Sequence, residues 1–356
     1  MKRSYIVSGV AVVLLCNCLI SSATQIRLPA GEEDSLYYQY KELEIIFTKL
    51  QENYSEIFSF ESIGKTYHER DIWLVKISDN VLVNETEPEL FFTGGIHGNE
   101  KSSTNVVMFS IMSLVENYTT LTVNKSFTEY VKNIVNNTEL YFIPIVNPDG
   151  YVANNRKNLR PNRCIFGRTF FRGVDLNRNF DYKREELKNY FFKNLLLGSR
   201  RTVLLPALDF SSIIKSGRYW GPYAFSEKET QAIKKFVEDH EISMGIDYHT
   251  YAKILGYDFP SQTRKIFYPW GWTEESPDDE QLLKSIATNI SKINDYDVLQ
   301  MSYWQYVFGF FSDWMYGEHD IIHYTIELDI ISNTPLNTTC ESHLLVNLYL
   351  AEIMLT

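Results

Sequence analysis

Apolar runs alternate with amphipathic segments along most of this chain. The spacing of Leu43, Ile46 and Leu50 is typical of an amphipathic helix. Runs such as ELFFTGG and ELYFIPIVN are typical of strands in the interior of a sheet. We predict helices over 36–53, 103–117 and 226–240, the last opened by a capping box from Ser226 to Glu229, and strands over 71–78, 89–95, 139–147, 242–250 and 322–330. This alternation predicts an α/β fold with a mostly parallel sheet.

Polar side chains gather where these strands end. His97 follows one strand after two glycines, and Glu100 begins the next helix. His249 closes a second strand, and Glu327 lies near the end of a third. An H-x-x-E pair alone is a weak signal in a chain of this length. Because open α/β sheets bind ligands at the carboxyl ends of their strands, we expect these four residues to line one cleft.

Two histidines and a glutamate are a sufficient ligand set for a catalytic zinc ion. Such a site takes three protein ligands and keeps one position open for water. His97, Glu100 and His249 supply His₂Glu. A separate carboxylate must accept the proton of that water, and Glu327 is the candidate general base. The sequence therefore predicts one Zn²⁺ per chain and a hydrolytic reaction.

The remaining candidates lie on a predicted loop. Arg160 is a candidate donor to an anionic intermediate, although a solvated basic segment is an open alternative. Asn177 and Arg178 can hold a carboxylate through paired hydrogen bonds, and a purely structural network with Asp175 is the alternative. Asp175 is the candidate acceptor for the second N–H of a ligating histidine.

A series of short motifs occurs in a characteristic order. They are SIGKTYHERDIWLVKISDN, GGIHGNE, NPDGY, GVDLNRNF, GPYAFSEKETQAI, HTY, YPWGWT, SDWMYG and TIELD. In this order the chain resembles the zinc carboxypeptidases of the pancreatic carboxypeptidase A/B and bacterial carboxypeptidase T type, over nearly all of its length after residue 35.

The resemblance implies a single domain with a mixed, mainly parallel eight-stranded sheet flanked by helices. It implies His97, Glu100 and His249 as zinc ligands and Glu327 as the general base. It also implies Arg160 as the group that polarises the substrate carbonyl. The clamp for the terminal carboxylate of a peptide or protein substrate is then Asn177 with Arg178.

The chain departs from the family pattern at several places. The family tyrosine nine residues before Trp314 is replaced by Gln305, and a shift of one residue gives that role to Tyr306. Residues 256–266 and 183–215 are longer than in the digestive enzymes. The resemblance therefore leaves open which residue makes the substrate contact of this tyrosine.

The residues that select the substrate are unusual. Ser312 stands at the pocket position where the family carries an apolar residue or an aspartate, and Tyr251 is a further implied contact. Gly271 matches the position of an aspartate in the branch that favours basic termini. Because Phe310 and Phe311 lie nearby, we expect a neutral or aromatic C-terminal side chain.

The N-terminus has the features of a secretory signal over residues 1–23. Lys2 and Arg3 precede a short apolar run broken by Asn17, and small residues follow; a membrane anchor is the alternative. Export would permit glycosylation at the N-x-S/T sites, which are Asn53, Asn84, Asn117, Asn124, Asn136, Asn289 and Asn337. We expect a secreted protein without stable membrane insertion.

Cysteine content and charge narrow the remaining possibilities. Cys164 and Cys340 would remain after cleavage, and one disulfide between them is plausible in an oxidising compartment. With 34 basic and 45 acidic residues the net charge is −11, which argues against a nucleic-acid partner. We expect a monomer in which a short segment, 24–34, precedes a catalytic domain over 35–356, with no large pro-domain.

Three functions remain open at this point. The first is a secreted metallocarboxypeptidase that removes one C-terminal residue from peptides. The second is a zinc hydrolase that acts on N-acyl amino acids or cell-wall peptides. The third is a pseudoenzyme that binds peptide tails, for which the replacement at Gln305 is the support. Retention of Glu327 argues against the third, because binding alone needs no general base.

Overall fold

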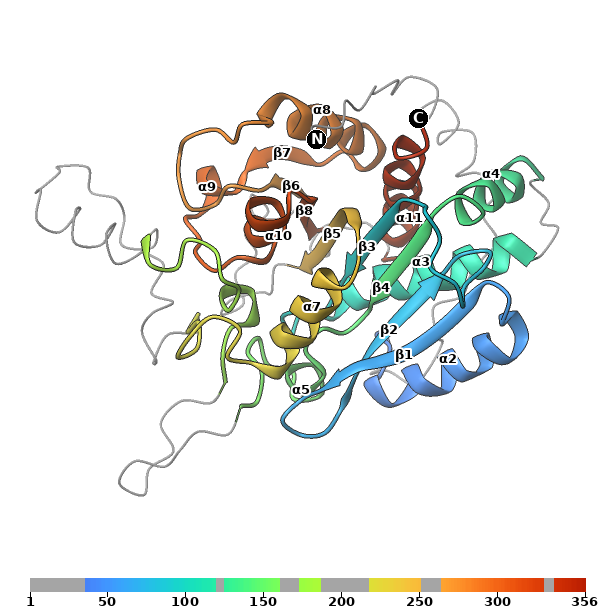
Figure 1. The fold of residues 1–356 in the computed structure, drawn as a ribbon, viewed down its shortest axis with the longest axis horizontal. Helices are drawn as coiled ribbons and strands as arrows, with labels where there is room; N and C mark the ends of the chain where they lie inside the picture. Colours follow the sequence, from blue (N-terminus) through green and yellow to red (C-terminus); the bar gives the residue numbers. More distant parts are fainter. Residues whose placement is uncertain (1–35, 120–124, 161–172, 187–217, 251–263, 330–335) are drawn as a thin grey trace, which may run out of the picture.

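A mixed eight-stranded sheet forms the centre of the protein (Figure 1). The computed structural model describes residues 36–119, 125–160, 173–186, 218–250, 264–329 and 336–356. The strand order is β1-β2-β4-β3-β5-β8-β6-β7. The strands are β1 Phe58–Lys65, β2 Asp71–Ile77, β3 Glu89–Thr93, β4 Glu139–Ile143, β5 Ile242–Thr250, β6 Lys265–Tyr268, β7 Asp297–Gln300 and β8 Ile322–Leu328.

The four central strands are parallel. β4 pairs with β3, β3 with β5, and β5 with β8, all in parallel register. Antiparallel pairs occur where β1 meets β2, β2 meets β4 and β6 meets β8, whereas β6 and β7 are parallel. The carboxyl ends of β3, β5 and β8 therefore lie side by side at one edge. The predicted mixed, mainly parallel sheet in a single α/β domain is confirmed.

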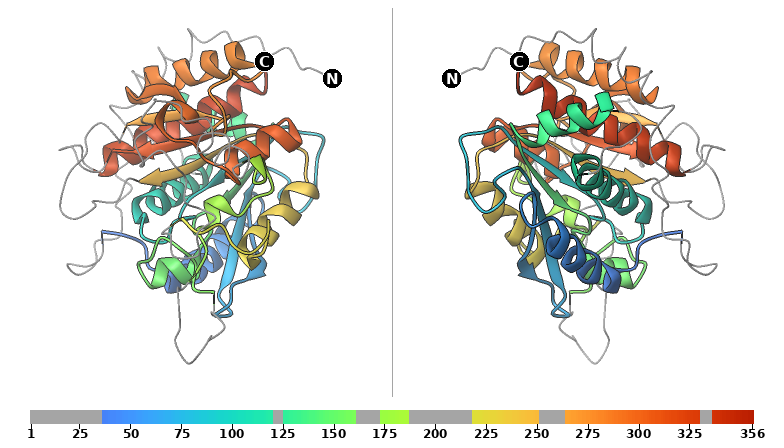
Figure 2. Two further views of the ribbon diagram at one scale, coloured as in Figure 1. Left: turned by 90° about the vertical axis from the view of Figure 1, so that its left-hand side faces the viewer. Right: turned by 90° about the vertical axis from the view of Figure 1, so that its right-hand side faces the viewer.

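Helices cover both faces of this sheet. α2, α3, α4, α8 and α11 pack in one apolar cluster that includes Leu90 and Phe92, and α7 and α10 pack in a second that includes Phe91 (Figures 1 and 2). The helices are α2 Tyr40–Tyr54, α3 Lys101–Thr119, α4 Lys125–Val135, α5 Pro148–Val152, α7 Lys228–Glu238, α8 Glu280–Asn294, α9 Met301–Trp304, α10 Phe311–His319 and α11 Leu336–Ile353, with a 3₁₀ turn, η2, at Leu176–Arg178. Successive residues of β3 thus face opposite layers, as strand geometry requires.

Two details of the predicted elements are wrong. The capping box at Ser226 is absent, because α7 begins at Lys228 with Glu227 as its N-cap. Ser226 Oγ instead donates to Glu227 Oε1 at 2.6 Å. For the apolar C-terminal stretch HLLVNLYLAEIMLT, which carries Glu352, the sequence favours an amphipathic helix, but residues 343–351 of α11 are all buried. This helix lies against α3 and α8, so it has little solvent-facing surface.

The predicted signal segment, residues 1–23, lies outside the described residues. Among the helices that the structure describes, none is long and apolar enough to cross a membrane.

Candidate metal centre and catalytic cleft

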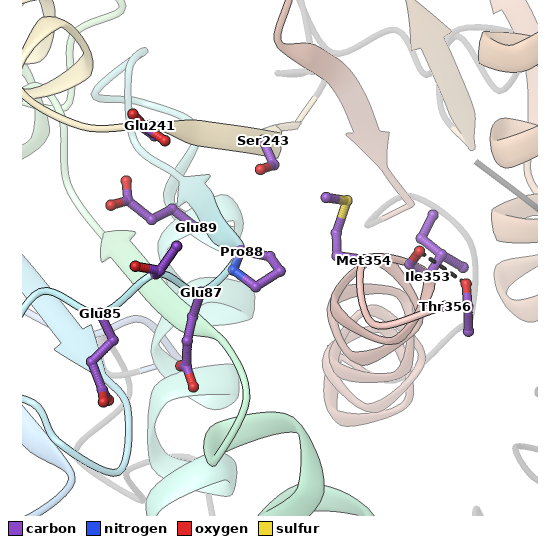
Figure 3. A pocket seen from close by; sticks show the side chains of 10 residues that line it. Glu85, Glu87, Pro88, Glu89, Glu241, Ser243, Ile353, Met354 and Thr356 are labelled. Atoms are coloured by element: carbon purple, nitrogen blue, oxygen red, sulfur yellow. Dashed lines mark hydrogen bonds between the residues drawn. The ribbon is translucent and has the colours of Figure 1, made fainter. Parts of the chain in front are cut away.

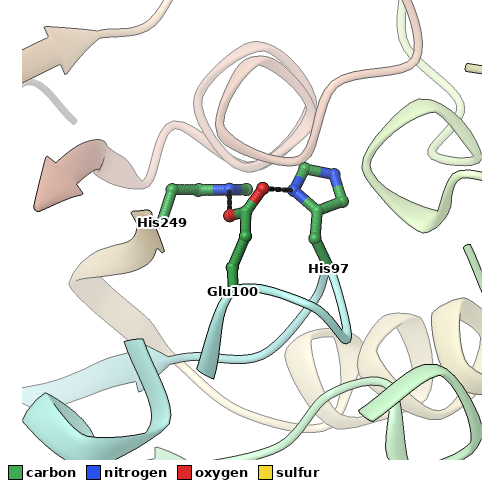
Figure 4. A group of neighbouring side chains, drawn as sticks. All are labelled: His97, Glu100 and His249. Carbon is green, nitrogen blue, oxygen red and sulfur yellow. Dashed lines mark hydrogen bonds and ion pairs between the residues drawn. The ribbon is translucent and has the colours of Figure 1, made fainter. Parts of the chain in front are cut away.

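Three predicted ligands converge at the carboxyl edge of the sheet (Figure 4). His97 lies in the loop after β3, Glu100 lies immediately before α3, and His249 is the penultimate residue of β5. The two oxygens of Glu100 lie 2.8 Å from His97 Nδ1 and 2.9 Å from His249 Nδ1. The three side chains offer ligand atoms within 4.8 Å of one another, and all three are buried.

Glycine makes the tight loop between β3 and α3 possible. Gly95 adopts a φ of +63°, in the left-handed region that glycine favours. At Gly98 a Cβ atom would lie 2.0 Å from the carbonyl carbon of Gly150. The backbone at Gly98 therefore packs directly against α5, which holds His97 and Glu100 in one short turn. This geometry explains Gly95 at the end of the apolar run ELFFTGG and Gly98 in the turn that follows it.

Two buried aspartates fix the orientation of the histidine rings. His97 Nε2 lies 3.1 Å from Asp175 Oδ1, and His249 Nε2 lies 2.7 Å from Asp247 Oδ2. Each Nε2–H can then donate to a carboxylate, which leaves both Nδ1 atoms as metal donors. The predicted contact of Asp175 with a ligand is present. Asp247 was not predicted, although its place two residues before His249 on the same strand was the available signal.

The charges of the cluster also fit a divalent cation. Burial disfavours ionisation of Glu100, but the charges of His97 and His249 outweigh it and lower the pKa of this carboxyl. Burial likewise opposes protonation of His249, but Asp247 and Glu100 outweigh it and raise its pKa. A positive charge is therefore needed to stabilise the buried carboxylates of the cluster, and a bound dication can supply that charge in place of protons. The donor set of two nitrogens and one carboxylate is suited to zinc.

Glu327 lies beside this cluster without a partner for one of its oxygens. On the parallel strands β5 and β8, Glu327 is the register neighbour of His249. Its side chain is 8% exposed, and Oε2 is buried without a hydrogen-bond partner among the described residues. Burial is the main reason that its pKa is raised to about 8. A buried carboxylate with an unused oxygen beside a metal site is well placed to accept a proton.

Asn177 and Arg178 lie together in η2, at the border of the same cleft. Asn177 Nδ2 lies 3.0 Å from His249 Nε2, and Asn177 Oδ1 accepts a hydrogen bond from the Phe311 backbone N–H at 3.0 Å. The Arg178 guanidinium is 4% exposed and donates to the Asn177 carbonyl oxygen. With His249 Nε2–H donating to Asp247, only the oxygen of the Asn177 amide is engaged, by the Phe311 N–H, and its Nδ2 stays a candidate donor to a substrate carboxylate together with the guanidinium of Arg178.

Two arginines of the predicted basic loop have different positions. Arg156 reaches the metal cluster: its Nε lies 3.0 Å from Asp175 Oδ2 and its Nη1 lies 3.3 Å from Glu100 Oε1. Arg160 forms an ion pair with Glu227, with 2.8 Å between Nη1 and Oε1. Sequence reasoning did not single out Arg156, because nothing in its spacing distinguishes it from Arg160. The role of Arg160 in polarising a carbonyl stays a prediction.

The candidate specificity residues are held tightly. Ser312 is 1% exposed, and its hydroxyl lies 2.9 Å from His323 Nδ1 and 2.7 Å from Thr325 Oγ1. Gly271 packs against Val307, so that a Cβ atom would lie 2.1 Å from Val307 Cγ2. A charged side chain cannot be accommodated at either position without rearrangement.

The aromatic candidates differ in position. Tyr306 Oη donates to Glu274 at 2.6 Å, and the neighbouring Gln305 has a buried amide nitrogen without a hydrogen-bond partner among the described residues. Phe311 is fully buried and stacks on Phe180, so it belongs to the core rather than to a substrate pocket. Tyr251 lies outside the described residues. Phe311 therefore no longer supports the expected preference for substrates with an aromatic C-terminal side chain.

The candidate glycosylation sites differ in their exposure to solvent. Asn53, Asn84, Asn136 and Asn337 are exposed, whereas Asn117 and Asn289 are 4% and 6% exposed. The Nδ2 atom that would carry a glycan donates to the Ser113 carbonyl in Asn117 and to Tyr349 Oη in Asn289. Glycosylation at these two residues is incompatible with the fold. Cys340 is buried in α11, and Cys164 and Asn124 lie outside the described residues, so the disulfide stays a prediction.

We expect Asp247→Asn to lower zinc affinity about 10- to 100-fold. An asparagine amide facing His249 Nε2 would favour the tautomer with its proton on Nδ1, the atom that must bind the metal. Competition with a calibrated zinc chelator measures the effect. Thr93→Val is the matched control, since it removes the 2.7 Å hydrogen bond to Asp247 Oδ1 without touching His249. Equal zinc affinities of Asp247→Asn and Thr93→Val would contradict the role of Asp247 in orienting His249.

Comparison with known proteins identifies the family of the chain. The family model described as zinc carboxypeptidase matches residues 43–341. A zinc carboxypeptidase from Saccharothrix mutabilis subsp. capreolus is 27% identical over 84% of this chain and 63% of its own length. Carboxypeptidase B from Astacus astacus is 26% identical over 82% of this chain and 86% of its own length. This chain thus spans less than two thirds of the first relative.

Solved structures support the fold. The crystal structure of carboxypeptidase A from Helicoverpa armigera superposes with a TM-score of 0.71 at 19% identity, covering 97% of this chain and 80% of that chain. Bovine thrombin-activatable fibrinolysis inhibitor, in complex with tick carboxypeptidase inhibitor, gives a TM-score of 0.67 at 22% identity, covering 90% of this chain and 97% of that chain. Since the family model covers most of the sequence and the fold agrees, the chain belongs to the zinc carboxypeptidase family.

Proposed function

We propose that this protein is a zinc metallocarboxypeptidase that hydrolyses the last peptide bond of peptides or proteins. The observation that carries the proposal is the position of Glu327 next to His249 in the sheet, with an unpartnered oxygen beside a complete His₂Glu donor set. A binding protein would gain nothing from such a buried carboxylate, which costs free energy to keep unpaired.

The residues have distinct tasks in this reaction. His97, Glu100 and His249 would hold zinc, which when bound lowers the pKa of a water toward about 7 and polarises a carbonyl. Glu327 accepts a proton from the attacking water and returns it to the departing amine. The products are a shortened peptide and a free amino acid.

The substrate is positioned by cationic groups. Arg178 binds the terminal carboxylate, which restricts cleavage to the last bond. Arg160 is our candidate donor to the carbonyl oxygen, and to act there it would exchange its ion pair with Glu227 for the substrate. Arg156 instead contacts Glu100 and Asp175, so we assign it to the support of the metal ligands.

We further propose that the protein is exported and acts as a monomer. The apolar segment in 1–23 and the four exposed sequons at Asn53, Asn84, Asn136 and Asn337 support export. The specificity residues favour a neutral C-terminal side chain, because neither Ser312 nor Gly271 supplies the negative charge that a basic terminus requires.

A pooled peptide assay tests the function. The set varies only in its C-terminal residue, and half of it is C-terminally amidated; products of the zinc-loaded chain are identified by mass spectrometry. We expect loss of single residues from the free-acid peptides only. Cleavage of N-acyl amino acids or cell-wall peptides, without cleavage of this set, would favour the second hydrolase function. Peptide binding without any turnover would favour a pseudoenzyme.

A further inference from the structure

One cavity of the protein lies too far from the metal ligands to receive the end of a substrate. It has a volume of about 700 Å³ and opens between the start of β3 and the end of α11, where Figure 3 shows Glu89, Ile353 and Met354 among its lining residues. Glu89 begins β3, whereas His97 follows its carboxyl end, and β3 alone spans roughly 13 Å. The space for a C-terminal side chain must therefore be sought at the carboxyl edge of the sheet, beside Arg178.

The face of the sheet next to Glu327 is covered over a short distance. Because successive residues of a strand alternate between the two faces, Glu327 and Thr325 of β8 share one face and lie roughly 7 Å apart along the strand. The hydroxyl of Ser312, in the first turn of α10, lies 2.7 Å from Thr325 Oγ1 and 2.9 Å from His323 Nδ1. The start of α10 therefore closes this face within one strand repeat of the proposed general base.

An apolar cluster closes the neighbouring part of the same face. Phe267 of β6 is the register neighbour of Thr325 on β8, so both side chains point to the same side of the sheet. Phe310, the N-cap residue of α10, is 4% exposed and packs in a small cluster whose other buried members are Phe267, Met301 and Val307. The Phe310 side chain is therefore part of the layer that covers the sheet beside Thr325.

The same aromatic ring also reaches the proposed carboxylate clamp. Arg178 Cζ lies 5.8 Å from the centre of the Phe310 ring. Arg178 Nη1 donates to the Asn177 carbonyl oxygen, and Asn177 Nδ2 lies 3.0 Å from His249 Nε2, so the guanidinium is close to the metal cluster. A C-terminal residue whose carboxylate is held by Arg178, with its scissile bond beside Glu327, therefore brings its side chain against Phe310.

The backbone fixes the position of Phe310 relative to Arg178. Gly309 adopts a φ of +64°, and a Cβ atom there would lie 2.4 Å from the Arg178 carbonyl oxygen. The Gly309 N–H donates to the Tyr182 carbonyl oxygen at 2.9 Å, and the Gly309 carbonyl oxygen accepts from the Phe180 N–H at 3.2 Å. Because these hydrogen bonds tie Gly309 to the segment that follows the clamp, Phe310 cannot withdraw by a simple shift of the backbone.

We propose that Phe310 restricts the substrate to peptides that end in a small neutral residue, namely glycine, alanine or serine. This inference rests on the peptidase function proposed above and names the substrate class of the same site. Protein interiors are close-packed, so a leucine or phenylalanine side chain placed beside Arg178 would overlap the Phe310 ring. Overlap of this kind weakens binding by about 10- to 100-fold. The preference for an aromatic terminus expected from the sequence is thereby reversed, because Phe310 fills the space that such a side chain would need.

Two peptides that differ only in their last residue test this selection. With the zinc-loaded protein, we expect kcat/KM for the peptide ending in alanine to exceed that for the peptide ending in phenylalanine by about 10- to 100-fold. Phe310→Ala should remove this difference by accelerating cleavage of the peptide ending in phenylalanine. Phe310→Leu leaves a smaller cavity and costs less stability, and it should shift the ratio in the same direction by a smaller amount. Faster cleavage of the peptide ending in phenylalanine by the unmodified protein would overturn the proposal.

Phe109→Ala is the matched control for Phe310→Ala. Phe109 on α3 is 3% exposed and belongs to the apolar cluster on the opposite face of the sheet. Its replacement also removes a buried aromatic ring, but it should leave the ratio of the two rates unchanged. An equal change of the ratio in Phe109→Ala would show a general loosening of the fold, and the assignment of selectivity to Phe310 would then be wrong.

A binding measurement separates this inference from the peptidase function. The zinc-loaded Glu327→Gln chain is titrated calorimetrically with the same two peptides, and binding does not require their cleavage. Tighter binding of the peptide ending in alanine, lost when Phe310→Ala is added, supports the size limit whether or not the unmodified protein turns the peptides over. Cleavage of both peptides at equal rates would keep the peptidase function and reject the size limit, and binding of neither peptide would reject both.

Discussion

Glu327→Gln is expected to lower kcat by about 10³- to 10⁴-fold while zinc content and peptide affinity stay unchanged. Glutamine keeps the size of the side chain but cannot accept a proton, and Glu327 is not among the three metal ligands. Single-turnover kinetics with a free-acid peptide, with metal content measured in parallel, gives both quantities.

The pH dependence follows from the same carboxylate. Because Glu327 acts only when ionised, activity is lost as pH falls through its pKa. Burial raises that pKa to about 8 in the cluster without metal, and a neighbouring dication shifts it back down. Glu318→Gln, at an exposed position of α10, is the control. Activity within about threefold of the unmodified protein in Glu327→Gln would assign the base to another group.

Arg178→Met is expected to reduce kcat/KM for free-acid peptides roughly 10²- to 10³-fold and to leave the slow cleavage of amidated peptides almost unchanged. Arg178 is 4% exposed, and a charge-assisted pair between a buried guanidinium and a carboxylate is strong. Methionine fills similar space without the charge. The ratio of the rates for free-acid and amidated peptides, measured with matched sequences, shows directly whether Arg178 binds the terminal carboxylate.

An exposed lysine provides the control for Arg178→Met. Lys235→Met removes the charge of an exposed lysine on α7 that pairs with Asp239, and it should leave the ratio intact. If Arg178→Met lowered both rates equally, the arginine would support the fold of η2 and would not bind the terminal carboxylate. If the ratio fell only in Arg178→Met, the specificity for C-termini would be explained by this side chain.

The sequence could suggest which residues lie near one another because strand ends are visible in it. His97, Glu100, His249 and Glu327 follow apolar runs, and parallel strands bring their carboxyl ends to one edge. His97, Glu100 and His249 offer ligand atoms within 4.8 Å of one another, and Glu327 is the register neighbour of His249, although this arrangement depends on the register of pairing. Periodicity alone does not give that register.

Other features depend on contacts that are distant in sequence. Asp247 is an exception: it lies only two residues before His249 on β5, and sequence reasoning passed over it because the run around it is apolar. The two basic side chains Arg156 and Arg160 are equivalent in sequence, but one reaches Asp175 and the other reaches Glu227. The start of α7 was misplaced because the Ser226 hydroxyl is used elsewhere: it donates to Glu227 Oε1 and accepts from Asn179 Nδ2.

The pairing of β5 with β8 makes catalysis a measure of correct folding. His249 reaches the metal cluster from one strand, and Glu327 reaches it from the next. A slip of one residue between the strands would turn Glu327 to the other face of the sheet, while the three ligands, from β5 and the β3–α3 turn, would stay together. Such a molecule would bind zinc and remain inert. Turnover per bound zinc ion therefore reports the fraction of chains whose last strand has joined the sheet in the native alignment, which bulk metal analysis cannot detect.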